Sequence, residues 1–281
     1  MNALEIKDMS KSFTGFKLDN ISFTLPSGCI LGLVGENGAG KSTTIKLILD
    51  MLHKDSGSIK VLGKDNAEDI KTVKEDIGVV MDAAGIPECL NARQVGKIMN
   101  GTFQNWNNGF YRDTLQKLSI PDNKPYKDLS RGMKMKLGIA IAVSHGSKLL
   151  LLDEPTSGLD PVVRDEVVEI FNEFTRDENH SVLISSHIVS DLEKLCDYIA
   201  FLHKGKLILF EEKDVLLGEY GVIHCTEEQL SELDEEALVH RKVTPYGAEA
   251  VVRREMIPGS ISVSPISIED LFVHMVKEEA V

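Results

Sequence analysis

The sequence predicts an α/β fold: a mostly parallel sheet core with an N-terminal antiparallel β subdomain, an inserted α-helical subdomain and a small α+β C-terminal appendage. Three observations support this prediction. Short apolar segments alternate with helical segments, which is the pattern of a parallel sheet covered on both faces. Residues 86–146 change to helical runs, and residues after 210 become acidic and less regular.

The expected elements follow one another in a regular order. Short apolar segments beside turn residues predict strands at residues 3–7, 21–25, 29–34, 59–62, 77–81, 149–152, 182–185 and 199–202. Apolar residues at helical spacing predict helices at residues 41–52, 162–175 and 188–195. The helical subdomain at residues 86–146 contains the only tryptophan, Trp106, and an Asn-rich loop at residues 105–108.

The division of the chain is expected near residue 210, with residues 1–210 as the main domain and residues 211–281 as the appendage. Residues 227–236 hold six carboxylates in ten residues, which predicts a solvated helix face. Ser267 and Asp270 resemble a capping box. The helical face expected behind it consists of Ile268, Leu271, Phe272, Met275 and Val276. The role of the appendage is open.

The composition excludes several classes of protein. The chain has 31 Lys and Arg against 44 Asp and Glu, a net charge of −13, which argues against a nucleic-acid partner. No run of 18 apolar residues predicts a transmembrane helix, so work at a membrane is expected to need a partner. The four cysteines lack the spacing of a zinc site or disulfide framework, and reduced thiols in a cytosolic protein are expected.

A glycine-rich motif follows the strand predicted at residues 29–34 and opens the helix that begins at residue 41. It consists of Gly35, Glu36, Asn37, Gly38, Ala39, Gly40, Lys41 and Ser42, and Thr43 follows it. Glycines let backbone N–H groups turn toward phosphate oxygens, and the helix N-terminus adds partial positive charge. The motif predicts a phosphate-binding loop of the P-loop NTPase type, in which Lys41 reaches the β- and γ-phosphates and Ser42 binds Mg²⁺.

Two carboxylates, Asp153 and Glu154, end the strand predicted at residues 149–152. Ligands of α/β proteins bind at this edge of the sheet. We expect Asp153 to hold Mg²⁺, directly or through water, and Glu154 to act as general base on the attacking water. Taken alone, the pair also fits an ordinary strand end with two capping acids.

Three further segments belong to the same pattern. Residues 129–134 (Leu-Ser-Arg-Gly-Met-Lys) lie between the glycine-rich motif and the acidic pair, and residues 157–160 (Ser-Gly-Leu-Asp) and then His187, after a strand, follow the pair. Together with the phosphate-binding loop and the acidic pair, they resemble the nucleotide-binding subunit of ATP-binding cassette (ABC) transporters. The resemblance covers about residues 1–210. Within this family, the chain is similar to the small export-type ATPases that are encoded apart from their membrane subunit.

The resemblance implies a function for each matching position. Phe13 would stack on adenine, with a buried strand phenylalanine as the alternative. Ser130 and Gly132 would contact the γ-phosphate of ATP held by the other subunit, and Asp160 would lie in the dimer seam. His187 would hydrogen-bond the γ-phosphate and position the water. Each site is then completed by the second subunit, so a monomer is expected to hydrolyse ATP poorly.

The sequence departs from the family pattern at two places. Arg131 and Met133 replace a glycine and the glutamine of the usual Leu-Ser-Gly-Gly-Gln. Arg131 is either a further cation near the phosphates or a solvated surface residue. Asp82 stands where the family has a glutamine that senses Mg²⁺, and it is expected to meet the metal directly or through water. Because Lys41, Asp153, Glu154 and His187 are intact, active hydrolysis is expected.

The resemblance implies an ATPase motor that uses ATP and Mg²⁺, dimerises, and drives a separate transmembrane permease from the cytoplasmic face of the membrane. Export of drugs, antimicrobial peptides or lipids is the expected task, with the helical subdomain supplying the docking surface. The alternative is a soluble single-cassette ABC ATPase that acts in cofactor or complex assembly. A GTPase is disfavoured because no Asn-Lys-x-Asp motif occurs. The cargo and the choice between homodimer and heterodimer are open.

Overall fold

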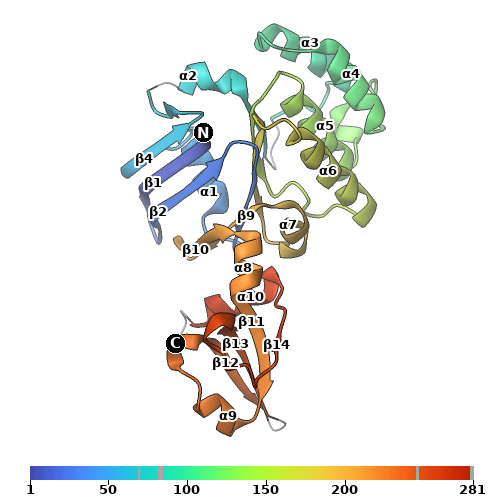
Figure 1. Ribbon diagram of the computed structural model, residues 1–281. Coiled ribbons are helices and arrows are strands. Elements are labelled where there is room, and N and C mark those ends of the chain that lie inside the picture. Colours follow the sequence, from blue (N-terminus) through green and yellow to red (C-terminus); the bar gives the residue numbers. More distant parts are fainter. Residues whose placement is uncertain (69, 82–84, 245–246, 279–281) are drawn as a thin grey trace.

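The computed structural model describes residues 1–68, 70–81, 85–244 and 247–278. Within these residues the strands form a six-stranded central sheet, a four-stranded N-terminal sheet and a four-stranded C-terminal sheet (Figure 1). In the same residues, no helix combines the length and the apolar character needed to cross a membrane.

The central sheet confirms the predicted parallel core. Its strand order is β10 (Lys206–Glu212), β9 (Tyr198–His203), β3 (Ile30–Val34), β8 (Ser181–Ser186), β7 (Leu149–Asp153) and β6 (Ile77–Val80). All neighbouring pairs are parallel except β10 with β9, which form an antiparallel hairpin. Every residue of β3, β7 and β8 is buried, because both faces of the sheet are covered.

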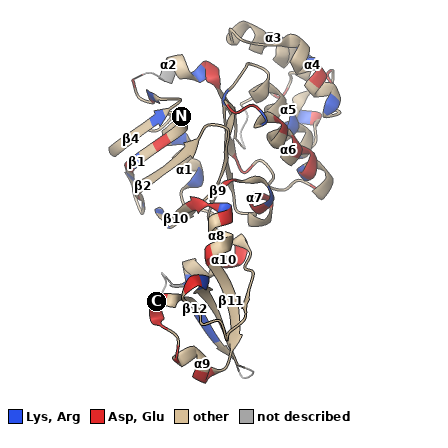
Figure 2. Cartoon of the chain, viewed as in Figure 1, with Lys and Arg blue, Asp and Glu red and all other residues tan. Residues whose placement is uncertain are grey.

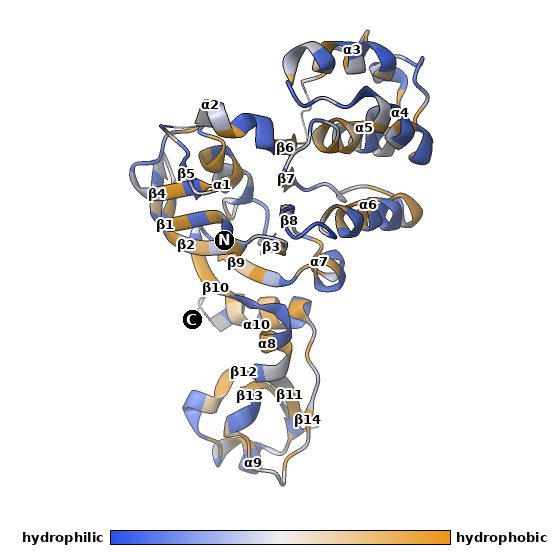
Figure 3. Cartoon of the chain, turned by 45° about the horizontal axis from the view of Figure 1, so that its top comes forward, coloured by the Kyte–Doolittle hydropathy of each residue, from blue (hydrophilic) through white to orange (hydrophobic). Residues whose placement is uncertain are grey.

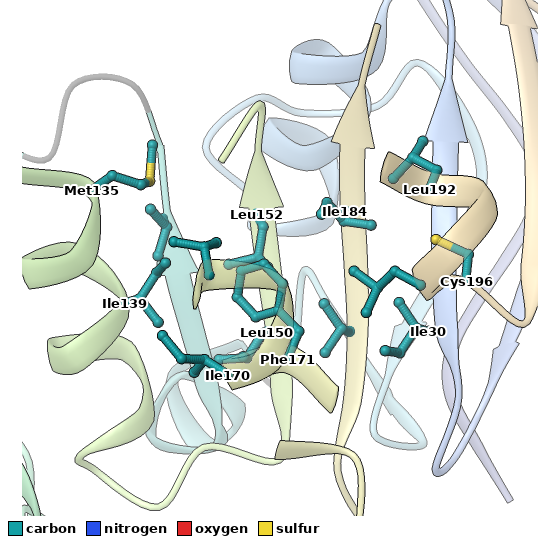
Figure 4. Close-up of a cluster of buried hydrophobic side chains, with 14 of the residues drawn as sticks. Ile30, Met135, Ile139, Leu150, Leu152, Ile170, Phe171, Ile184, Leu192 and Cys196 are labelled. Carbon is teal, nitrogen blue, oxygen red and sulfur yellow. The ribbon is translucent and has the colours of Figure 1, made fainter. Parts of the chain in front are cut away.

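Alternate side chains of the central strands enter two different cores. Leu150 and Leu152 pack against helices α5 (Arg131–Val143) and α6 (Pro161–Phe174), close to Phe171 (Figure 4). Helix α7 (Val189–Leu195) covers the same face through Leu192. Leu149 and Leu151 point the other way, toward helix α1 (Lys41–Ile48) and the N-terminal sheet. The period-2 alternation of strand side chains thus separates the two cores.

The N-terminal sheet is the predicted antiparallel subdomain. Its strand order is β2 (Phe16–Pro26), β1 (Asn2–Phe13), β4 (Ser56–Val61) and β5 (Lys64–Asp65). The strands β1 and β2 are longer than the sequence suggests, because the short turn at Thr14-Gly15 lets them pair almost from end to end. The helix expected at residues 41–52 ends at Ile48, and Asp50 then adopts a left-handed backbone conformation.

The inserted region contains α3 (Ala92–Thr102), α4 (Asn108–Lys117), the 3₁₀ turn η2 (Tyr126–Asp128) and α5. The short elements α2 (Ile70–Val73) and η1 (Lys74–Asp76), which the sequence did not suggest, precede β6. Trp106 is buried, and the side chain of Asn107 in the Asn-rich loop accepts a hydrogen bond from Phe110 N as the N-cap of α4. Helix α5 also packs directly on β6, so it belongs to the central core as well as to the helical region.

The C-terminal sheet has the strand order β12 (Leu238–Thr244), β13 (Gly247–Arg253), β11 (Tyr220–Cys225) and β14 (Val263–Ser264). The prediction of one helix over residues 227–236 is wrong. Helix α9 (Glu227–Ser231) is short and ends at Ser231, and the 3₁₀ turn η3 (Glu235–Ala237) follows as a separate element. The six carboxylates are all exposed, as predicted. Acidic positions at α9 are red in Figure 2.

Helices α8 (Lys213–Glu219) and α10 (Ile268–Glu278) lie between the C-terminal sheet and the central sheet (Figures 1 and 3), and the turn η4 (Arg254–Met256) follows β13. The Ser267 hydroxyl caps α10 by accepting a hydrogen bond of 3.0 Å from Asp270 N. Of the predicted face, Ile268, Leu271 and Phe272 are buried, and the Phe272 ring lies 5.1 Å from that of Phe201 in β9. The apolar core is therefore continuous from the central sheet into the appendage.

Candidate active site

The phosphate-binding loop predicted from the glycine motif lies between β3 and α1. Gly35 cannot carry a side chain, because a Cβ there would lie 2.4 Å from the carbonyl oxygen of Leu202 in β9. Gly40 has a left-handed φ of 113°, and its Cβ would lie 2.5 Å from Leu18. No side chain caps the N-terminus of α1. Its first backbone N–H groups therefore stay available to an anion.

Lys41 is the central cation of the loop. Its side chain is only 5% exposed, although lysine rarely occupies such a place without partners. The Nζ atom donates to the Gly35 carbonyl oxygen at 2.6 Å and to the Glu36 carbonyl oxygen at 3.2 Å. It also lies 3.1 Å from Glu154 Oε1. A buried ammonium group surrounded by oxygens is a suitable partner for phosphate oxygens.

Asp153 and Glu154 come from the end of β7 and are held by the neighbouring strand β8. The Ser185 hydroxyl donates to Asp153 Oδ1 at 2.7 Å, and Asp153 is 6% exposed. Glu154 N donates to Ser185 O and to Ser185 Oγ, both at 3.1 Å. Glu154 has a φ of 51°, a left-handed conformation that costs a non-glycine residue about 1–2 kcal/mol. Strain of this kind is typical of functional sites.

His187 completes this first group. Its Nδ1 atom lies 2.6 Å from Glu154 Oε2, while Lys41 contacts the other oxygen of the same carboxylate. The His187 ring is 41% exposed and Glu154 21% exposed, so one side of the group faces solvent. The structure therefore brings together Lys41, Asp153, Glu154 and His187 from three separate segments of the chain.

Ser130, Gly132 and Asp160 form a second group at the starts of α5 and α6. Ser130 Oγ accepts a hydrogen bond from Met133 N, and Asp160 Oδ1 accepts one from Val163 N, so both side chains are N-caps. A Cβ on Gly132 would lie 3.2 Å from Val163 Cγ1. The two segments thus pack against each other within one chain.

Arg131, the departure from the family pattern, lies against the same second group. A Cβ on Gly158, whose φ is 68°, would lie 2.7 Å from Arg131 Nη1. The guanidinium therefore lies against the backbone at Gly158, so close that a Cβ there would displace it. Arg131 joins the two segments of the second group.

The remaining predicted residues differ in their exposure. Phe13 is 40% exposed at the end of β1, with its ring centroid 6.3 Å from that of Phe16 and Lys11 Nζ 5.9 Å from it. The alternative of a buried phenylalanine is therefore wrong. Glu36, Asn37 and Gly38 are exposed, Ala39 is buried, and Ser42 and Thr43 are half-buried. Asp82 lies outside the described residues.

Known proteins resemble this chain in both sequence and fold. A family model described as ABC transporter matches residues 18–157. The lantibiotic transport ATP-binding protein SrtF of Streptococcus pyogenes is 37% identical over 75% of this chain and 91% of its own length. The chain belongs to the ABC transporter family. It is an ATPase of this family, and it binds ATP.

Other ABC proteins extend the comparison. The uncharacterized ABC transporter ATP-binding protein YhcH of Bacillus subtilis is 29% identical over 98% of this chain and 96% of its own length. The bacitracin transport ATP-binding protein BcrA of Bacillus licheniformis is 32% identical over 73% of this chain and 68% of its own length. A solved ATP-binding subunit of an ABC transporter superposes with a TM-score of 0.69 at 27% identity, over 76% of this chain and 91% of that one.

One residue of this ABC site was not found from the sequence. Ser185 is fully buried and holds both residues of the acidic pair: its hydroxyl donates to Asp153 Oδ1 and accepts from the backbone N–H of Glu154. The available signal was the polar pair Ser185-Ser186 at the end of an otherwise apolar strand, just before His187. That pattern indicates a strand end, but only the pairing of β7 with β8 brings Ser185 next to Asp153.

Proposed function

We propose that the chain is the ATP-hydrolysing motor subunit of an export-type ABC transporter, which closes as a dimer around two ATP–Mg²⁺ sites and drives a separate permease. In this proposal residues 1–210 form the ATPase domain, and residues 211–281 form the appendage. The chain is cytoplasmic and reaches the inner face of the membrane through its permease. The relatives that are named for lantibiotic and bacitracin transport support a peptide or drug as cargo.

The carboxylate of Glu154 is the observation that supports this proposal most directly. Lys41 approaches one of its oxygens at 3.1 Å and His187 the other at 2.6 Å. Phosphoryl transfer to water needs a base beside the attacking water and positive charge beside the transferred group. Glu154 supplies the base, Lys41 the charge, and His187 holds the base and meets the γ-phosphate. Lys41 Nζ already lies among oxygen atoms of the protein. When ATP binds, its phosphate oxygens would take the place of these partners.

A magnesium ion fits beside this group. Ser42, in the first turn of α1, supplies a hydroxyl, and Asp153, at the end of β7, supplies a buried carboxylate, and both are oxygen ligands of the kind Mg²⁺ prefers. Within the described residues, no three His, Cys, Asp or Glu side chains gather in a group that could hold a metal. This matches Mg²⁺, which takes one or two protein oxygens and completes its shell with phosphates and water. When bound, the ion neutralises charge on the β- and γ-phosphates.

The second group is proposed to serve the site of the other subunit. Ser130, Gly132 and Asp160 gather at two helix N-termini, and a helix N-terminus favours an anion. The partner is either a second copy of this chain or a related ATPase. Arg131 holds the two segments of this group together, so they would enter the partner site as one unit.

The variant Glu154→Gln tests the assigned base. It keeps the size of the side chain and removes the basic oxygen, so ATP should bind and drive a dimer visible by light scattering while turnover is abolished. Glu173→Gln is the matched control, because Glu173 is also ion-paired, 2.5 Å from Lys117, on α6 away from the site. Normal hydrolysis by Glu154→Gln would show that the base is a different group.

The permease is tested by tagged purification of the chain from detergent-solubilised membranes, with mass spectrometry of the copurifying proteins. The proposal predicts a polytopic membrane protein in near-equal amount. Recovery from the soluble fraction without any integral membrane protein would favour the soluble assembly ATPase instead.

A further inference from the structure

His187 is placed by the helix that follows it. It lies directly after β8, and α7 begins two residues later at Val189. The turn between them is held by a hydrogen bond of 2.9 Å from Ile188 N to Ser186 Oγ. Any displacement of α7 is therefore passed to the His187 ring, which lies 2.6 Å from Glu154.

The first turn of α7 is linked to the first turn of α6 by an ion pair. Arg164 Nη1 lies 3.5 Å from Asp191 Oδ1, and the two helices are in contact. Asp191 is only 8% exposed, so this pair is not an ordinary surface pair. Arg164 N in turn donates to Asp160 O at 3.0 Å, which is the first backbone hydrogen bond of α6. One short path therefore joins Asp160 to His187.

The pair is incompletely matched. Arg164 Nε and Asp191 Oδ2 are both buried and have no hydrogen-bond partner. Arg and Asp prefer a two-pronged arrangement, in which two N–H groups meet two carboxylate oxygens. A turn of the guanidinium, or a small approach of α6 to α7, would bring Nε to the carboxylate and satisfy both atoms. The arrangement in the structure is therefore the looser one, with a tighter pairing within reach of a small movement.

The other side of α7 is held by the appendage. Ile268 N, at the start of α10, donates to Glu193 Oε2 at 3.2 Å, and Leu192 and Leu195 are buried in the shared core. Helix α7 therefore lies between a fixed contact with α10 and an adjustable contact with α6. A movement of α6 would therefore act on α7 from the side that carries the Arg164–Asp191 pair.

We propose that Arg164 and Asp191 are positioning residues for His187, which link the dimer seam to the chemistry. Closure of the dimer on Asp160 would shift the start of α6, complete the Arg164–Asp191 pairing, and set α7 so that His187 meets the γ-phosphate. This inference rests on the proposed function, because the dimer seam at Asp160 belongs to that proposal.

Three changes to the pair test the inference in the purified full chain. Asp191→Asn and Arg164→Met each remove one partner, and Arg164→Met with Asp191→Leu removes both. Each should lower kcat for ATP hydrolysis about tenfold to a hundredfold, with KM for ATP changed less than about twofold, because misplacement costs rate rather than binding. The double variant should regain the melting temperature that the single variants lose, since it leaves no unpaired buried charge.

A purely structural pair would behave differently. In that case kcat would recover together with the melting temperature in the double variant, and this result would overturn the proposal. Arg164→Lys keeps the positive charge but cannot meet the two oxygens of Asp191 with two N–H groups at once. Its kcat should therefore fall while its melting temperature stays unchanged. A wild-type kcat in Arg164→Lys would also contradict the inference. Asp76→Asn is the control, because Asp76 pairs with Lys148 at 3.1 Å at the opposite end of the sheet.

The two proposals fail in distinguishable ways. If the wild-type chain hydrolyses no ATP, the proposed function is wrong. If the wild type is active and the Arg164 and Asp191 variants are equally active, only the positioning inference is wrong. In a Glu154→Gln background, the pair variants should still dimerise with ATP, because the pair acts after the subunits meet.

Discussion

The carboxyl edge of the central sheet and the C-terminal sheet are built on different principles. At the central edge, Lys41, Asp153 and Ser185 are all buried: the Ser185 hydroxyl donates to Asp153 Oδ1, and Lys41 Nζ is ion-paired with Glu154. The core of the C-terminal sheet is purely apolar, and its ion pairs, such as Arg253 with Glu219, are partly exposed. Buried charge is costly and adds little stability by itself, so the group of buried charges at this edge indicates a ligand site there.

The two regions are nevertheless joined. Phe272 and Leu271 of α10 lie in the same apolar cluster as Ile184 and Phe201 of the central sheet. The appendage therefore stabilises the face of the sheet that carries α7, although its own sheet holds no comparable set of buried charges among the described residues. Four predictions test this contrast, in order of decreasing effect.

Lys41→Ala should have the largest effect, because it removes the buried cation of the phosphate-binding loop. We expect ATP hydrolysis to fall about a hundredfold to a thousandfold, as for the loss of a principal charge-stabilising donor. Steady-state ATPase kinetics measure the change. Lys46→Ala, on the same helix α1, is the control and should retain activity. If the Lys41→Ala protein hydrolysed ATP normally, the buried charges of the central edge would not mark the catalytic site, and the contrast with the C-terminal sheet would be wrong.

Phe272→Ala should lower the free energy of unfolding by about 3 kcal/mol, because it removes a buried aromatic ring that packs on Phe201. A single, shifted thermal transition is expected, since the core is continuous between the regions. Val273→Ala, at a position 39% exposed on the same helix, should have little effect. Two separate transitions would show that the appendage unfolds independently.

Ser185→Ala should affect the site more than the fold. Loss of the hydroxyl that holds Asp153 is expected to raise the Mg²⁺ concentration needed for half-maximal hydrolysis about tenfold. Titration of the ATPase rate with Mg²⁺ measures this. Ser181→Ala is a close control, because Ser181 is an equally buried, hydrogen-bonded serine at the other end of β8. Equal effects of the two substitutions would mean that Ser185 acts only on stability.

Acid pH should lower the free energy of unfolding slightly. Burial lowers the pKa of His145, beside the helical region, and of His274 in α10, from their ordinary value of 6.5. The unfolded chain therefore binds protons below about pH 6.5 that the folded chain does not bind. The free energy of unfolding should fall on acidification, by at most about 1.4 kcal/mol per pH unit for each histidine.

Denaturant unfolding between pH 7 and pH 5 measures this dependence. His145→Asn and His274→Asn should each flatten it, whereas His53→Asn, at an exposed position, should not. His274 also faces His240 and Lys277, whose charges lower its pKa, and Asp270 and Glu249, which raise it. An unchanged slope in His274→Asn would place the acid sensitivity outside the appendage.

Much of the fold followed from local sequence patterns. The parallel central strands and the helices α6 and α7 lie within a few residues of their predicted positions, because apolar periodicity and turn residues act locally, whereas the antiparallel edge strand β10 was not predicted. The positions of the C-terminal strands β11 to β14 were not predicted. Strand β11 pairs with β13 and β14, which lie far from it along the chain, although β12 and β13 are neighbours in sequence. The helix expected over residues 227–236 is not continuous in the structure. A run of acidic residues indicates that a segment is exposed, but it does not indicate that the segment forms one helix.

The sequence by itself determined the chemistry of this protein: a glycine loop with Lys41, an acidic pair and His187, in an order that few folds share. Spacing within a motif is local, so a linear pattern can specify it. Only the tertiary structure decided which partners these residues have. Ser185 beneath the acidic pair, Arg131 on Gly158, and Arg164 beside Asp191 are contacts between segments that are distant along the chain. The register of β7 against β8 and the packing of α6 on α7 create them, and no local pattern encodes either.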